Sequence, residues 1–295
     1  MATPPRSVDR RPVSLTDALP PHAYFLVSAV FHYLGPAFAV LLFARVDVLG
    51  VAWLRIASAA VVFAAWRRPW RLWLAQSARQ RRDLLALGVA LALMNASFYL
   101  AIDRVPLGTV GAIEFLGTIA LAALGARTAR NGIALAVAVA GVWLLTDVRL
   151  AGEPLGIAFA FLNGVLFLVY VVLGHRIARE AGASGIDRLG VAMLIALVVV
   201  SPLGLREAAA AADAPRLILA GVGVGICSSV IPYVCDQLAM ARLSRASFAL
   251  LLALLPASAT VVGLVVLGQR PHPVEVAGVA LVVAGVAIHR SPASD

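Results

Sequence analysis

The stretch VPLGTVGAIEFLGTIALAALG, residues 105–125, contains one charged residue, Glu114, near its centre. An apolar run of about 20 residues can cross the hydrocarbon core of a bilayer as a helix. A charged group at the middle of such a helix costs about 3 kcal/mol or more. We therefore predict that this stretch spans a membrane and that Glu114 marks a binding site, a transport pathway or a proton relay. The structural alternative is a protonated carboxyl group that only hydrogen-bonds a neighbouring helix.

The composition of the whole chain supports a membrane setting. Of its 295 residues, 62% are hydrophobic and 13% are charged, about half the charged share of a soluble protein. The mean hydropathy is +0.95, which predicts lipid as the surrounding solvent. The net charge of +9 comes entirely from arginines, which cluster between apolar runs. This placement is typical of topology signals in membrane proteins, so we expect no nucleic-acid partner.

Runs of suitable length and polarity recur along the chain and predict an all-α membrane protein with ten transmembrane helices. The predicted spans are 24–43, 50–66, 84–102, 105–125, 132–146, 155–174, 189–205, 216–238, 245–267 and 274–289. The segment 67–83 between two of them is rich in arginine and tryptophan, and we interpret it as a solvated basic loop. Residues 1–23 form a polar tail that we expect to be disordered, and 290–295 form a second short tail.

The arginines fall mainly on one side of these spans. The two tails and the even-numbered connections carry 17 of the 24 arginines, and the odd-numbered connections carry 6. By the positive-inside rule, both tails lie in the cytoplasm, which requires an even number of spans. We therefore predict a multi-pass membrane protein, and the family resemblance described below implies that its location is the bacterial inner membrane.

The two halves of the chain resemble each other. YLAIDRVPLGTVGAIEFLGTIA (99–120) is similar to QLAMARLSRASFALLLALLPASA (237–259), and AVAVAGVWLL (136–145) is similar to ALVVAGVAIH (280–289). These matches predict two five-helix repeats, 24–146 and 154–289. Because five is odd, the second repeat would be inverted in the membrane, an arrangement typical of secondary transporters with a substrate site at the midplane.

Three further ionisable groups lie inside predicted spans. Arg55 could extend to the interface, bind a substrate carboxylate through its planar guanidinium, or pair with Glu114. Asp236 could be a site residue, although an interfacial pairing with Arg242 or Arg245 is favoured. His32 could line a cavity or be a hydrogen-bonded histidine of the interior. Burial disfavours the charged form of a carboxyl group, so Glu114 could bind and release a proton during a transport cycle.

Other polar groups and prolines within the spans complete the candidate set. Polar side chains there either join helices or line a cavity: Asn95, Ser97, Tyr99, Asn163, Tyr170, Ser228, Ser229 and Tyr233. Of these we select Asn95, Tyr99, Tyr170 and Tyr233 as substrate-binding candidates beside Arg55, Glu114 and His32. Pro36, Pro232 and Pro256 are expected to interrupt helix hydrogen bonding. Cys227 and Cys235 match no metal spacing, and GVGVG (221–225) lacks the Lys-Ser/Thr of a P-loop, so we expect no metal or cofactor.

Several stretches also resemble a known family. WLRIASAAVVF (53–63), MNASFYLAIDRVPLGTVGAIEF (94–115), SSVIPYVCDQLAMARL (228–243) and VLGQRPHPVEVAGVALVVAGV (266–286) resemble the EamA branch of the drug/metabolite transporter superfamily. Within that branch, the similarity is to the bacterial threonine/homoserine exporter subfamily. The resemblance extends over residues 24–289 and implies a ten-helix, ion-driven exporter of small metabolites built from two inverted repeats.

The resemblance also assigns expected roles to single residues. Glu114 matches the acidic residue after VPLG, Arg55 matches the arginine of the second helix, and Asp236 stands where an acidic residue follows Pro-Tyr. Three positions depart from the family pattern. Leu255 replaces a glutamate before Pro256, Thr118 stands at the first-half proline position, and Gly268–Gln269 replaces a Gly-Glu pair. These departures concentrate the expected proton chemistry on Glu114.

We therefore expect a secondary exporter of small amino acids, threonine- or homoserine-like, or of related polar metabolites, working by proton-coupled alternating access. In this hypothesis, Arg55 holds the substrate carboxylate and Glu114 accepts the amine or exchanges protons. Efflux of cationic or apolar drugs is the alternative within transport, and a polytopic membrane enzyme is the alternative outside it. The sequence leaves open the substrate, the coupling ion, and whether the chain forms a homodimer.

Overall fold

The computed structural model describes residues 20–125, 128–150, 153–179, 185–242 and 254–288, and all regular structure in these ranges is helical. The helices are α1 (Pro21–Leu42), α2 (Val48–Arg67), α3 (Pro69–Ala75), α4 (Ala78–Ile102), α5 (Leu107–Gly125), α6 (Ala129–Leu150), α7 (Pro154–Arg179), α8 (Gly185–Ala209), α9 (Pro215–Gly225), the π-helical turn η2 (Ile226–Val230), α10 (Ile231–Arg242), α12 (Leu254–Leu267) and α13 (Pro273–Ile288). The prediction of an all-helical membrane protein is confirmed at this level.

Six helical segments are long and apolar enough to cross a membrane. They are α1, α2, α4, α7, α8 and the continuous segment formed by α9, η2 and α10. Shorter apolar segments lie in α5, α6, α12 and α13. The count of ten spans therefore stays a prediction, and residues 245–253 of the span predicted at 245–267 lie outside the described residues.

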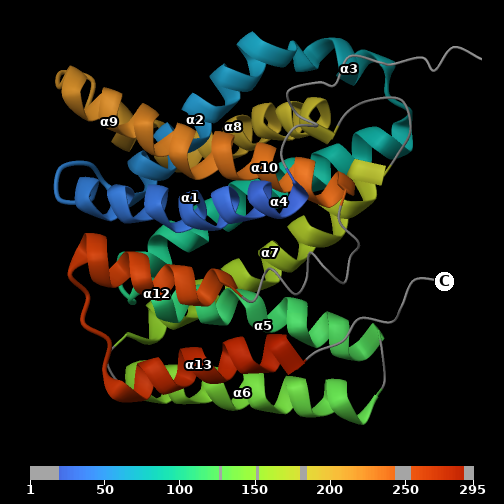
Figure 1. The fold of residues 1–295 in the computed structure, drawn as a ribbon. Helices are drawn as coiled ribbons and strands as arrows, with labels where there is room; N and C mark the ends of the chain where they lie inside the picture. Colours follow the sequence, from blue (N-terminus) through green and yellow to red (C-terminus); the bar gives the residue numbers. More distant parts are fainter. Residues whose placement is uncertain (1–19, 126–127, 151–152, 180–184, 243–253, 289–295) are drawn as a thin grey trace, which may run out of the picture.

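The helices run side by side and pack in a regular set of pairs (Figure 1). α2 packs on α8, α5 on α12, and α6 on α13. Between these pairs, α4 contacts α7 and α8, whereas α1 contacts α10 and α12. α1 begins and α13 ends at the same end of the bundle, and the loops after α1 and after α12 lie at the opposite end. We call these the inner end and the outer end, respectively.

The basic segment 67–83 is not simply a loop, which corrects the sequence interpretation. It contains the short helix α3 and the first residues of α4. Ser77 caps α4: its hydroxyl accepts from the backbone N–H of Gln80, whose side chain in turn accepts from the Ser77 N–H, a reciprocal capping box. This cap lets α4 continue beyond the apolar run, so its arginines extend the helix at the inner end.

The chain between α9 and α10 contains the π-helical turn η2, close to α2. Such turns are uncommon and are frequently found at functional sites. The close approach depends on Gly225, since a Cβ atom there would lie 2.7 Å from the backbone carbonyl oxygen of Arg55. On the same helix, Gly223 has no neighbour within 4 Å of such an atom.

This contrast gives a test of the packing of α9 on α2. We expect Gly225→Ala to destabilise the protein by about 1–3 kcal/mol, the usual cost of overpacking. Gly223→Ala should leave stability unchanged or raise it slightly, because alanine favours helices. Melting temperatures of the purified variants in detergent check this. Equal melting temperatures for the two variants would contradict the packing of α9 on α2.

Candidate functional site

Glu114 lies in the interior of the helix bundle, where its carboxylate receives hydrogen bonds from two other helices. The residue is 2% exposed. The Tyr33 hydroxyl on α1 donates to Oε2 at 3.1 Å, and Asn163 Nδ2 on α7 donates to Oε1 at 3.2 Å. Neutral donors to each oxygen stabilise a carboxyl group that would otherwise be costly to bury. Glu114 thus faces the protein rather than lipid.

Arg55 is also buried, with 4% of its surface exposed, and α2 presents it to the π-helical turn. Its Nε donates to Ser229 Oγ at 2.8 Å, and its Nη2 donates to the carbonyl oxygen of Ser228 at 2.9 Å. The guanidinium carbon lies 5.3 Å from the centre of the Tyr99 ring, within the range of a cation–π interaction. Of the five guanidinium N–H groups, two are used by these hydrogen bonds among the described residues.

The Arg55 side chain therefore does not extend to the interface, which decides one of the alternatives left open by the sequence. In the described part of the chain, it also forms no salt bridge with Glu114 within 4.0 Å. Both groups instead line one cavity, at separate places on its wall. The remaining N–H groups of Arg55 are the cationic donors available to this space.

The cavity is small, and six of its eight lining residues have polar side chains. It is lined by His32, Arg55, Met94, Asn95, Phe98, Glu114, Asn163 and Tyr233. The side chains close on this space and leave room for about one water molecule. The structure is thus a nearly closed state of this cavity, and a ligand larger than water needs the helices to move apart.

The structure brings together five of the seven candidate substrate-binding residues. Arg55, Glu114, His32, Asn95 and Tyr233 line the cavity. Tyr99 lies behind Arg55, under its guanidinium group. Tyr170 is buried outside the cavity and packs against Tyr233, with ring centres 5.5 Å apart.

The remaining candidates lie along the helices around the cavity. Pro36 is inside α1, Pro232 is the second residue of α10, directly after the π-helical turn, and Pro256 is in α12. Asp236 is buried and accepts a hydrogen bond from the Ser28 hydroxyl. It is not paired with Arg242, whose guanidinium carbon lies 5.6 Å from the centre of the Tyr24 ring. Arg245 lies outside the described residues.

Sequence reasoning did not select the groups that hold the two charges in place. Asn163, Ser228 and Ser229 were among the polar residues of the spans but could not be sorted, and Tyr33, Met94 and Phe98 were not candidates. A partial signal was present, because Tyr33 adjoins His32 in a helix with few polar residues. The phase of each helix about its own axis decides which of these side chains meet, and composition does not encode that phase.

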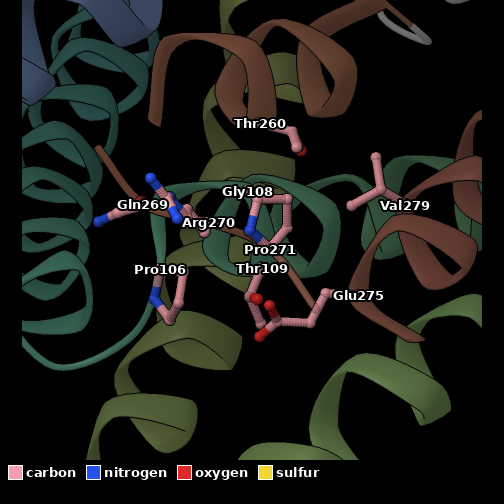
Figure 2. Close-up of a pocket in the computed structure, with 9 residues that line it drawn as sticks. All are labelled: Pro106, Gly108, Thr109, Thr260, Gln269, Arg270, Pro271, Glu275 and Val279. Atoms are coloured by element: carbon pink, nitrogen blue, oxygen red, sulfur yellow. The ribbon is translucent and has the colours of Figure 1, made fainter. Parts of the chain in front are cut away.

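A second pocket lies at the outer end, where the loop between α12 and α13 covers the start of α5 (Figure 2). Its lining consists of Pro106, Gly108, Thr109, Thr260, Gln269, Arg270, Pro271, Glu275 and Val279. Gln269 Oε1 accepts from the Leu107 N–H at 3.2 Å, and Glu275 Oε2 accepts from the His272 N–H at 2.8 Å. Both groups satisfy backbone donors where helices start. Glu275 is thus a buried carboxylate with a capping role outside the cavity.

Comparison with known proteins identifies the family. The second half of the chain, residues 154–290, matches the EamA-like transporter family. The chain is 32% identical over 286 residues to the threonine/homoserine exporter RhtA of Escherichia coli strain K12, covering 95% of this chain and 92% of that protein. The chain belongs to the EamA-like transporter family. The expected resemblance is thereby confirmed.

Other relatives of this EamA-like protein agree with that assignment. RhtA of Salmonella typhimurium strain LT2 is 32% identical over 256 residues, covering 85% of this chain and 84% of that protein. A solved crystal structure with 19% sequence identity aligns with 90% of this chain and 97% of its own chain, with a TM-score of 0.57. This similarity supports the fold. The EamA-like chain is accordingly a multi-pass membrane protein related to metabolite exporters.

Proposed function

We propose that this EamA-like protein is a proton-driven secondary exporter of small amino acids such as threonine and homoserine. The observation that carries the proposal is that one arginine and one glutamate lie at separate places on the wall of a single cavity. A zwitterionic amino acid carries the two complementary charges at its own α-carbon. The RhtA relatives are named for export of these two amino acids, which gives the substrate class.

The cavity offers a separate partner for each end of the substrate. The free N–H groups of Arg55 suit a carboxylate, which a planar guanidinium can bind through two parallel hydrogen bonds. Among the described residues, the donors to Glu114 are neutral, so its negative charge is available to the substrate ammonium or to a proton. Asn95 and His32 supply polar atoms for the side-chain hydroxyl group of threonine or homoserine.

The packing of the helices supports ten spans in two inverted repeats. In such a repeat, α1, α2, α4, α5 and α6 correspond to α7, α8, the α9–α10 segment, α12 and α13. The contact between α4 and α7 then corresponds to that between α10 and α1, and the contact between α5 and α7 corresponds to that between α12 and α1. The remaining pairs, α2–α8, α5–α12 and α6–α13, each join two corresponding helices, so exchanging the repeats leaves them unchanged. Motion of one repeat against the other would open the cavity to alternate sides.

In this proposal the inner end of the bundle faces the cytoplasm of a bacterium, with both termini on that side. The arginine distribution supports this orientation. The protein transports its substrate unchanged and is not an enzyme. Efflux of cationic or apolar compounds is the second candidate, but it does not account for a buried arginine on the cavity wall, since a cation would be repelled by it.

Uptake into inverted membrane vesicles tests the proposal. Vesicles that contain the protein should accumulate labelled threonine and homoserine when their lumen is acidic, and should stop when the pH gradient is dissipated. The matched control is a set of vesicles from cells that lack the protein. Accumulation of lipophilic cations without any amino acid would support the second candidate instead. Absence of uptake for every amino acid under both gradient directions would refute export of amino acids.

A further inference from the structure

Polar side chains continue from the Glu114 cavity toward the inner end along three helices. On α1, Ser28 lies one turn before His32, and on α10, Asp236 and Gln237 lie one turn after Tyr233. On α7, Tyr170 follows Asn163 by two turns, which places it about 10 Å farther along the helix. Because α1 contacts α10 and α10 contacts α7, these side chains share one region.

Asp236 is the carboxylate of this region and has little to hold it in place. It is 6% exposed, and among the described residues its only hydrogen bond comes from the Ser28 hydroxyl. In that part of the chain, no arginine forms an ion pair with it. A carboxylate used only for structure would be expected to have a fuller set of donors or an ion-pair partner. Among the described residues, the surroundings of Asp236 therefore leave part of its hydrogen-bonding capacity unused.

Three buried polar atoms in this region lack hydrogen-bond partners among the described residues. The Tyr170 hydroxyl and Gln237 Oε1 are buried without a partner among the described residues, and so is Asn163 Oδ1 beside Glu114. Buried polar atoms without a protein partner are commonly satisfied by internal water. The Tyr170 ring packs on Tyr233, which lines the cavity, so Tyr170 lies next to the wall that also contains Glu114.

We propose that Asp236 is a second proton-carrying group, which passes protons between Glu114 and the cytoplasm. This inference rests on the proposed function and extends it. Protonated Glu114 releases a proton to an adjacent water molecule and becomes a carboxylate. The Tyr170 hydroxyl accepts a proton from water on one side and donates its own on the other. The Asp236 carboxylate accepts that proton, and then releases it to water at the inner end, so that no charge is gained or lost overall.

The groups that face Asp236 are compatible with this role. Ser28 faces it from α1, Tyr170 lies near it on α7, and Tyr233 and Cys235 are near it on α10 itself. Of these, Ser28 is the direct donor to the carboxylate. None of the four is charged in its ordinary state, so the charge of Asp236 follows proton binding rather than an ionic partner. In the described ranges, neither α8 nor η2 contributes an ion pair to it.

Two measurements on reconstituted vesicles separate this role from a structural one. The first is accumulation of labelled threonine driven by a pH gradient, and the second is exchange of labelled for unlabelled threonine at equal pH. For Asp236→Asn, we expect gradient-driven accumulation to fall by about tenfold or more, because a proton acceptor is lost. Exchange should remain within about twofold of the parent, because exchange needs no net proton movement. Asp236→Glu, which keeps a carboxyl group, should restore most of the accumulation.

Other outcomes would overturn the inference. Equal loss of both activities in Asp236→Asn, without rescue by Asp236→Glu, would show a structural role, and parental accumulation would show no role. If Asp236→Asn does not fold, Ser28→Ala is the deciding variant. Removing the donor that the described residues provide to the carboxylate should raise the pH midpoint of accumulation by about half a unit or more. An unchanged midpoint would refute the relay. A parent protein that moves no amino acid would refute the proposed function itself, whereas an active parent with an unaffected Asp236→Asn variant would refute only the relay.

Discussion

Replacement of Glu114 by glutamine is expected to reduce gradient-driven export of threonine by about 100-fold or more, to the background rate. Glutamine keeps the size and the hydrogen-bonding oxygen of the side chain but cannot carry a proton or a negative charge. Tyr33 and Asn163 would still contact the amide, so the fold should persist. A loss of this size is typical when a group that transfers protons is removed. Initial rates of uptake into inverted vesicles, at several imposed pH gradients, measure it.

The matched control is Glu275→Gln, which changes a second buried carboxylate in the same way. Glu275 caps the start of α13 in the outer pocket (Figure 2) and does not line the Glu114 cavity. We expect this variant to transport at a rate within a few-fold of the parent, with the same dependence on the gradient. If Glu114→Gln matched the parent in rate and in gradient dependence for every amino acid tested, the proposed mechanism would be wrong even though the family assignment would stand.

Much of the architecture was predictable because the solvent determines it. Residues 105–125 were predicted as one span, and the structure has α5 at Leu107–Gly125. Apolar length alone locates such a helix, since a backbone in lipid must satisfy its own hydrogen bonds. The burial of Glu114 followed from the same argument. The arginine-rich segment 67–83 was misjudged because lipid imposes no such requirement there, and the capping residue Ser77 decides where α4 begins.

The neighbours of each buried charge were much less predictable. That Arg55 faces the interior depends on the π-helical turn, which brings Ser228 and Ser229 against it. If that segment were shifted by one residue, other side chains would face Arg55. Local sequence propensities do not indicate which of these arrangements forms. Asp236 was expected to pair with Arg242 or Arg245; Arg245 lies outside the described residues, and the described partner of Asp236 is Ser28, more than 200 residues earlier. Such long-range contacts are set by packing rather than by local sequence.

Replacement of Arg55 by lysine is the test with the second largest expected effect. Lysine retains the positive charge but loses the planar set of N–H groups that can bind a carboxylate while also holding Ser229 and Ser228. We expect the KM for threonine to rise about 10- to 100-fold, which corresponds to the loss of one or two charge-assisted hydrogen bonds. Arg55→Gln should raise it further. Initial uptake rates over a range of threonine concentrations measure the effect.

Arg55 also joins α2 to η2, so a control must separate substrate binding from packing. Arg104→Lys provides one, since Arg104 lies beyond the end of α4 and donates to the backbone carbonyl of Leu100 at 2.8 Å. We expect its KM to match that of the parent. The decisive comparison uses threonine amide, which lacks the carboxylate: the parent and Arg55→Lys should bind it with equal, weak affinity if the guanidinium recognises the carboxylate. If Arg55→Lys weakened threonine and its amide by the same factor, Arg55 would hold helices rather than substrate, and the cavity would recognise the amino acid through Glu114 alone.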